Sequence, residues 1–147
     1  MALKRTSTAV WTGDALTGNG ALTTQSGAFK SQPYSFKTRF TDESGRSGTN
    51  PEELIAAGHA GCFTMAMAFM LKEAGFVASE LRTDATVTLD QSQGNFRFTD
   101  INLNLNAKIP NITNERFQQI AEQAKANCPV SVALSAVPMH LTANLEK

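Results

Sequence analysis

Two cysteines are the residues of this sequence best suited to covalent chemistry. Cys62 lies in an uncharged segment, LIAAGHAGCFTMAMAFML (54–71), and Cys128 lies in NCPVS (127–131). Neither belongs to a C-x-x-C motif or to a Cys/His cluster, so we expect no structural zinc site. A reducing cytosol also disfavours a permanent disulfide. The two thiols are therefore either inert and packed, or they cycle between thiol and disulfide.

A reactive thiol in apolar surroundings needs a cation nearby, because burial raises the pKa of a thiol. Arg39, in the segment SFKTRF (35–40), and His59, one helical turn before Cys62, are the candidates for that cation. His59 could instead serve Cys62 as the base of a cysteine hydrolase. The sequence shows no partner that would orient the imidazole, and a lone histidine is more often structural.

The segment that contains Cys62 is predicted to be a helix that begins at Pro51, a residue favoured at the first helical position. Asn50 is a good N-cap, and Glu53 stands at the capping-box position. Gly75 suits the C′ position at which a helix stops. The helix therefore carries Cys62 near its middle.

No side of the predicted helix over residues 54–71 is charged. A helix packed once against a sheet needs only an apolar stripe, with polar residues opposite. A chain of 147 residues can hardly cover this helix on every side, so we expect a homodimer in which two central helices pack together. Gly58 and Gly61 would permit their close approach. The alternative is a monomer in which the segment is an ordinary core helix.

The elements before the helix are predicted to be strands. Segments 4–11 and 20–26 are rich in threonine and valine and are separated by glycines and an aspartate, which predicts a hairpin. SFKTRF alternates, which predicts a third strand with Phe36 and Phe40 on one face. Arg39 would then point away from those phenylalanines.

The elements after the helix complete an α+β fold. Strands are predicted over 83–90 and 95–109, with a turn at 91–94 and a bulge near Thr99, where the apolar side chains change from even to odd positions. A helix over 113–126, a short helix opened by Pro129 with Cys128 as its cap, and a last strand over 137–145 follow. We therefore expect one domain, residues 1–147, with mostly antiparallel sheets around the central helix.

The charge balance excludes several classes of partner. Lysine plus arginine and aspartate plus glutamate are 13 each, so no overall field gathers nucleic acid or an anionic membrane. The apolar segment approaches the length of a membrane span, but its histidine, glycines and threonine favour burial by protein. The first residues lack an apolar run of signal-peptide length, so a cytoplasmic location is expected. No motif calls for a cofactor.

Three stretches resemble those of a known family. NPEELIAAGHAGCF (50–63), NCPVS (127–131) and PYSFKTRF (33–40) are similar to segments of the OsmC/Ohr family, in its osmotically inducible protein C (OsmC) branch. WTGD near the start and EAGF at 73–76 extend the resemblance nearly end to end. The resemblance implies an intertwined homodimer in which strands of residues 1–49 are exchanged with or packed on the partner.

The same resemblance implies a thiol-dependent peroxidase that reduces organic hydroperoxides. By position, Cys62 is similar to the peroxidatic cysteine of the family and Cys128 to the resolving one. Arg39 corresponds to the arginine of the OsmC branch, and Glu52 to the carboxylate that holds it. The implied reductant is a dithiol, of lipoyl type rather than glutathione. A different function is also open, in which a dimeric binding module holds a hydrophobic small molecule and both cysteines are merely packed.

Helical geometry restricts how these residues meet. The path along a straight helix from Glu52 to Cys62 is about 15 Å, and the two side chains point roughly 80° apart. Either the helix breaks near Gly58, or Glu52 and Cys62 meet across the dimer. A disulfide needs its two Cα atoms within about 7 Å, which places the segment of Cys128 against the central helix.

The residues around Cys62 also suggest a substrate preference. Phe63, Met65 and Met67 follow it closely in the sequence, and Phe36 or Phe40 is a further candidate for the same apolar surface. Each buried methylene of a substrate would contribute about 0.8 kcal/mol. We therefore expect bulky organic hydroperoxides to be better substrates than hydrogen peroxide.

Overall fold

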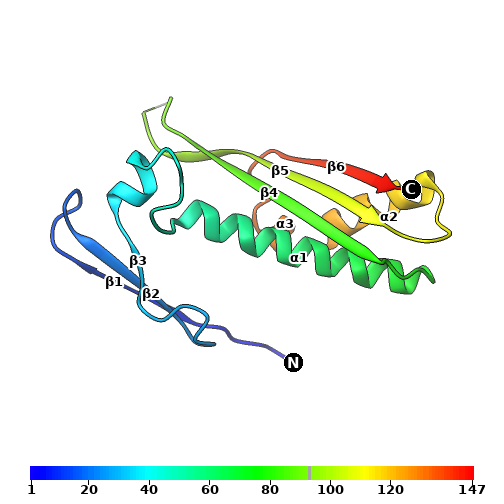
Figure 1. Cartoon of the computed structure of the whole chain (residues 1–147), viewed down its shortest axis with the longest axis horizontal. Coiled ribbons are helices and arrows are strands. Elements are labelled where there is room, and N and C mark those ends of the chain that lie inside the picture. Colours follow the sequence, from blue (N-terminus) through cyan, green and yellow to red (C-terminus); the bar gives the residue numbers. More distant parts are fainter. Residues whose placement is uncertain (93) are drawn as a thin grey trace. The chain divides into compact units, whose positions relative to one another are not determined.

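The computed structural model (Figure 1) describes residues 1–92 and 94–147. The chain forms two compact units, Met1–Leu54 and Ile55–Lys147. Each unit contains a three-stranded sheet. The predicted α+β class is confirmed.

The sheet of the first unit is an antiparallel meander. It consists of β1 (Ser7–Thr12), β2 (Asn19–Thr24) and β3 (Gln32–Tyr34), in that order. β1 and β2 pair in register from Ser7 opposite Thr24 to Thr12 opposite Asn19, which confirms the predicted hairpin. Gly20 lies under the ring of Tyr34, where a Cβ would overlap a ring carbon. Only glycine fits that position.

The predicted strand over residues 35–40 is wrong. The chain forms instead a short π-helical turn, η1 (Lys37–Thr41). Ser35 and Thr38 bond to each other at the start of the turn, since the Ser35 Oγ accepts from the Thr38 N–H at 3.2 Å and the Thr38 hydroxyl donates to the Ser35 carbonyl at 3.0 Å. The rings of Phe36 and Phe40 pack with centroids 4.8 Å apart. Residues four apart share a face in a helix and in a strand, so the sequence pattern could not separate the two.

The long helix α1 (Pro51–Glu73) begins and ends as predicted. The Asn50 side chain accepts from the Glu53 N–H at 2.8 Å. The Glu53 carboxylate does not close a capping box but accepts from the Thr49 hydroxyl at 2.8 Å. At the other end, Gly75 has φ +83°, and the Phe76 N–H bonds back to the Leu71 carbonyl at 2.8 Å, as in a Schellman motif.

The sheet of the second unit has the order β4-β5-β6. β4 (Glu80–Asp90) and β5 (Arg97–Lys108) are antiparallel, whereas β6 (Met139–Glu146) runs parallel to β5 after two intervening helices. Thr88 pairs with Asp100 and Leu89 with Phe98. Thr99 is thus the extra residue of a bulge, which confirms the predicted bulge. The predicted turn at 91–94 includes Gln93, which lies outside the described residues.

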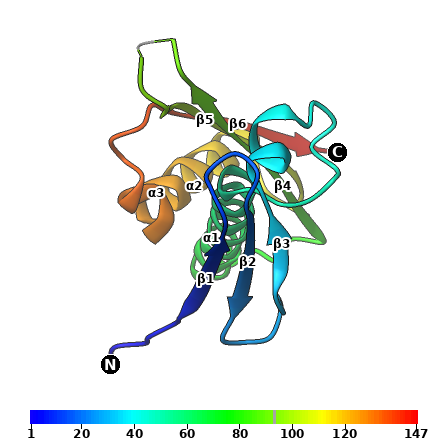
Figure 2. The same cartoon turned by 90° about the vertical axis from the view of Figure 1, so that its left-hand side faces the viewer.

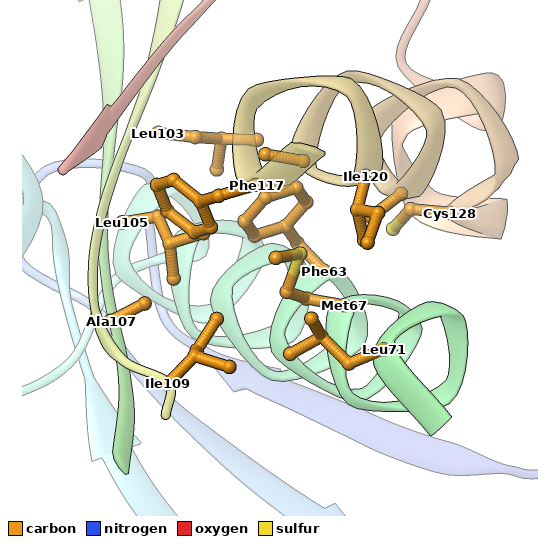
Figure 3. Packing of buried hydrophobic residues seen from close by; sticks show 12 residues of the cluster. Phe63, Met67, Leu71, Leu103, Leu105, Ala107, Ile109, Phe117, Ile120 and Cys128 are labelled. Carbon is orange, nitrogen blue, oxygen red and sulfur yellow. The ribbon is translucent and has the colours of Figure 1, made fainter. Parts of the chain in front are cut away.

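The core of the second unit lies between one face of this sheet and the helices α1 and α2 (Asn114–Asn127), as Figure 3 shows. The apolar side chains along one side of α2 are buried. Helix and sheet contribute these side chains: Phe63, Met67 and Leu71 from α1, Leu103, Leu105 and Ala107 from β5, and Phe117, Ile120, Ala121 and Ala124 from α2. The core therefore encloses one stripe of α1.

The opposite side of α1 is apolar and exposed. Ala57, Gly61, Met65 and Phe69, four residues apart in turn, form what we call the exposed stripe. The side chains of Met65 and Phe69 are 75% and 61% exposed. By length and composition α1 would also suffice to span a bilayer, a test that core helices of soluble proteins pass as well. Figure 2 looks along this helix.

Candidate active site

The two cysteines lie side by side in the second unit. Their Sγ atoms are 3.1 Å apart, and both are free thiols. Cys62 is partly exposed on α1, whereas Cys128 is fully buried. In Figure 3, Cys128 lies next to Ile120 and over the helix that carries Phe63 and Met67. The expectation that the segment of Cys128 lies against the central helix is confirmed.

Cys128 occupies the junction of two helices. It is the C-cap of α2 and the N-cap of the short helix α3 (Pro129–Ala133), with φ −65° and ψ 119°. A residue before proline is pushed out of the helical conformation, so Pro129 ends α2 at this point. The Cys128 N–H still bonds to the Ala124 carbonyl at 2.9 Å. The chain thereby fixes the direction of the Cys128 side chain toward α1.

Backbone N–H groups at the start of α3 donate to both sulfurs. The Val130 N–H bonds to the sulfur of Cys62, and the Ser131 N–H to that of Cys128. Burial raises the pKa of the Cys62 thiol, and the neighbouring Cys128 raises it further. Burial also opposes ionisation of Cys128, but the Ser131 N–H, Cys62 and the Ser131 hydroxyl together lower its pKa. Within the second unit, Cys62 is therefore the harder of the two to ionise.

Arg39 and Glu52 form an ion pair in the first unit. The Arg39 Nη2 lies 2.7 Å from the Glu52 Oε1, and the Arg39 Nε lies 3.3 Å from each carboxylate oxygen. The side chains are 32% and 13% exposed. The guanidinium also lies 4.8 Å from the centroid of the Phe40 ring. The prediction that Arg39 points away from the phenylalanines is therefore wrong. Hydrogen bonds from two of its nitrogens to the Glu52 carboxylate fix the orientation of the guanidinium.

The helix that carries Glu52 and Cys62 is continuous. α1 extends without interruption from Pro51 to Glu73. This excludes the first of the two alternatives, a break of the helix near Gly58. The other alternative, in which Glu52 and Cys62 of different chains meet, stays a prediction.

His59 does not serve Cys62. Its ring is fully buried, and its Nε2 lies 2.8 Å from the Ser131 Oγ. Its Nδ1 has no hydrogen-bond partner among the described residues. Burial lowers the pKa of His59, which favours the neutral imidazole. The arrangement required for a His59-assisted cysteine hydrolase is not formed.

Ser131 is the site residue that sequence reasoning did not identify. It stands in the same NCPVS segment as Cys128, and a short helix beginning at Pro129 turns its side chain back toward that cysteine. The proline after Cys128 and the serine three residues after it could have indicated this contact. The contact with His59, however, joins residues far apart in the chain and depends on how α3 packs on α1.

The expected apolar wall beside Cys62 is wrong in its main members. Phe63 and Met67 are fully enclosed in the core and offer no surface to a substrate. Met65 points outward on the exposed stripe. Helical periodicity explains the error, because residues 63 and 67 lie on the buried side of α1 and residue 65 on the other side.

Comparison with known proteins identifies close relatives of this arrangement. Residues 42–142 match the family described as OsmC-like protein. The chain is 45% identical over 136 residues to the peroxiredoxin OsmC of Escherichia coli (strain K12), covering 92% of this chain and 93% of that protein. The crystal structure of the organic hydroperoxide resistance protein OhrB of Bacillus subtilis aligns with a TM-score of 0.67 at 26% identity, over 96% of this chain and 98% of that one. An OsmC-like protein from Mycoplasma pneumoniae aligns with a TM-score of 0.78 at 18% identity, over 100% of both chains, which bears on the fold alone.

Proposed function

Because this chain belongs to the OsmC family, we propose that it is a thiol-dependent peroxidase that reduces organic hydroperoxides to alcohols. The observation that carries the proposal is the 3.1 Å separation of the Cys62 and Cys128 sulfurs. Thiols at that distance can pass from a sulfenic acid to a disulfide with little movement of the backbone. The reaction then proceeds through an intramolecular disulfide.

In the first step, Cys62 is the nucleophile. Cys62 is partly exposed, whereas Cys128 is fully buried, so only the sulfur of Cys62 can meet a substrate. The Cys62 thiolate forms a bond to one peroxide oxygen and the O–O bond breaks. The other oxygen leaves with a proton as the alcohol, and Cys62 becomes a sulfenic acid.

Arg39 supplies the charge that this step requires. Burial raises the pKa of Cys62, so its thiolate needs a cation nearby. We infer that the guanidinium of Arg39, oriented by Glu52, favours the thiolate and stabilises charge on the leaving oxygen. Because α1 is unbroken, the pair is proposed to reach Cys62 from the partner subunit. An arginine held by a carboxylate suits this role, since its charge persists at every physiological pH.

In the second step, Cys128 resolves the sulfenic acid. The resulting disulfide prevents further oxidation of Cys62. A dithiol reductant, proposed to be of lipoyl type, would reopen the disulfide in the cytoplasm.

Two features support the proposed homodimer. The exposed stripe leaves an apolar face of α1 without a cover in its own unit. In addition, the residues buried within 1–54 are Gly18, Gly20 and Thr49, none of which is a large apolar side chain. A unit without an apolar core is not stable alone. Residues 1–49 are therefore proposed to pack on the partner or to be exchanged with it.

A titration of thiols tests the proposed reaction. One equivalent of cumene hydroperoxide should remove both free thiols of each chain and yield one equivalent of alcohol. The Cys62→Ser variant should release no alcohol, and Cys128→Ser should support about one turnover before overoxidation. A non-enzymatic binding module would lose no thiols under the same conditions, and that result would refute the proposal.

A further inference from the structure

His59 is a buried polar side chain that the proposed reaction does not use. Its ring is 0% exposed, and its Nδ1 has no partner among the described residues. An unpaired polar atom in a core costs free energy that an aliphatic side chain of similar size would not cost. Its presence therefore calls for an explanation other than stability.

Ser131 connects this histidine with the sulfurs. Its Oγ lies 2.8 Å from the Nε2 of His59. Ser131 also follows Cys128, the N-cap of α3, within the same helical turn, and hydrogen bonding by its N–H and hydroxyl lowers the pKa of Cys128. Ser131 is only 5% exposed, so these are its partners rather than bulk water. A hydroxyl has one proton to donate. If that proton goes to the sulfur of Cys128, the oxygen must accept from the Nε2–H of His59.

We propose that His59 and Ser131 are positioning residues for the second step, in which donors aligned from the His59 Nε2 through the Ser131 Oγ orient Cys128 and favour its thiolate. This inference rests on the proposed function. The Cys128 sulfur forms a bond to the Cys62 sulfur while the S–OH bond of Cys62 breaks. The leaving hydroxide takes up the proton that Cys128 gave up, and one water is released. Cys128 is oxidised and the sulfenic sulfur is reduced.

The geometry assigns this effect mainly to the second step. In the described part of the chain, the His59 ring contacts Ser131 through Nε2 and no hydrogen bond joins it to Cys62. The backbone donor of Cys62 is Val130, which substitutions of the His59 and Ser131 side chains leave in place. Loss of the aligned donors should therefore slow disulfide formation much more than alcohol release.

Single-turnover kinetics separate the two steps. With one equivalent of cumene hydroperoxide, Ser131→Ala should release alcohol at the wild-type rate within about twofold. It should lose its second thiol about tenfold more slowly, the effect of roughly one hydrogen bond. Ser131→Thr, which keeps the hydroxyl, should restore the rate. Ser135→Ala, at an exposed position, is the matched control and should behave as wild type.

Variants of His59 give a second route to the same result. His59→Leu fills the space without a donor and should resemble Ser131→Ala, whereas the amide of His59→Gln can still donate to Ser131 and should recover part of the rate. Excess hydroperoxide should drive Cys62 to the sulfinic acid in the slow variants, as intact mass would show. Equal slowing of both steps, or unchanged disulfide formation in folded variants, would overturn the proposal.

A measurement without peroxide keeps this inference separate from the proposed function. In the Cys62→Ser background, the ¹³Cβ shift of Cys128 reports its ionisation. Adding Ser131→Ala should move the titration of Cys128 to higher pH, and adding Ser135→Ala should not. Absence of that difference would contradict the role of Ser131 even if the peroxidase activity is confirmed. Failure of the wild-type protein to release alcohol would instead contradict the proposed function.

Discussion

At the scale of single residues, the site divides its tasks between side chains and backbone. The sulfur of Cys62 receives an N–H from Val130, and that of Cys128 an N–H from Ser131. These donors do not offset the burial of Cys62, whose pKa remains raised. The proposed cation is therefore the residue whose loss should affect the first step most.

Substitution of Arg39 tests that role. Arg39→Gln should lower kcat/KM for cumene hydroperoxide by about 10²-fold, as loss of a stabilising donor does. The kcat/KM of Arg39→Lys should fall between those of the wild type and Arg39→Gln, because lysine keeps the charge but not the two-nitrogen contact with Glu52. Glu52→Gln should also lower kcat/KM. The control is Arg82→Gln, which removes an exposed arginine paired with Asp84. Wild-type kinetics in Arg39→Gln would exclude Arg39 from the reaction.

The buried imidazole predicts a dependence of stability on pH. Burial lowers the pKa of His59 below its ordinary value of 6.5, so between the folded and unfolded pKa values the unfolded chain binds more protons. Above pH 6.5 the histidine is neutral in both states, and its protonation does not affect stability. As the pH falls through that window, the unfolded chain gains a proton that the folded chain does not, so the free energy of unfolding decreases. Urea unfolding of the reduced protein should show a steeper loss of stability from pH 7.5 to pH 5 in wild type than in His59→Leu. Parallel profiles would contradict this account.

Contacts between residues far apart in the chain could be expected only where the family resemblance supplied them. The pairing of Arg39 with Glu52 and of Cys62 with Cys128 followed from the resemblance, and the structure brings each pair together. The link between His59 and Ser131 was not predicted, because no short-range pattern encodes a contact between α1 and α3.

At the scale of elements, the positions of the helix ends decide where the sulfurs lie. Caps and breakers were the most reliable part of the sequence: Asn50, Gly75 and Pro129 each act where predicted. The strand prediction for residues 35–40 failed, because Phe36 and Phe40 are four residues apart and such residues share a face on a helical turn as well as on a strand. The hydrogen bonds between Ser35 and Thr38 then stabilise the turn over the strand. Such competition between patterns is not visible in hydrophobic spacing alone.

Removal of Pro129 tests how far the helix junction matters. In Pro129→Ala the constraint on Cys128 is relaxed and α2 can continue through it, which would turn the sulfur away from Cys62. We expect disulfide formation to slow by about tenfold or more, since small misplacements are costly to reaction rates. Quenched-flow alkylation would measure the remaining thiols. The control is Pro110→Ala, an exposed proline after β5, and equal rates in the two variants would refute this role.

At the scale of the whole molecule, two kinds of apolar surface lack a cover. One is the exposed stripe of α1, and the other is β1, all of whose residues are exposed, including Val10 at 57%. The sequence predicted a second chain from the uncharged helix alone. It could not indicate which side of the helix the chain covers by itself, since the helix is apolar all round and carries no amphipathic signal.

Two glycines of α1 give opposite expectations for a monomer and a dimer. A Cβ added at Gly58 or Gly61 would meet no described atom within 4 Å. In a lone chain, alanine at these helical positions should therefore raise the free energy of unfolding by about 0.5–1 kcal/mol. If two central helices approach closely in a homodimer, Gly58→Ala and Gly61→Ala should weaken dimerisation instead. Light scattering across a dilution series, with urea unfolding, distinguishes the two, and a gain in stability with unchanged mass would exclude close helix packing.

Joining Cys62 to Cys128 closes a loop of 66 residues. In the chain-entropy account, a cross-link of that span restricts the unfolded chain by about 4 kcal/mol. The disulfide form of the enzyme is therefore harder to unfold than the reduced form, and each turnover alternates between these two forms. This added resistance works against reopening of the bond. A reductant whose own second thiol can displace the mixed disulfide is better matched to that demand than a monothiol.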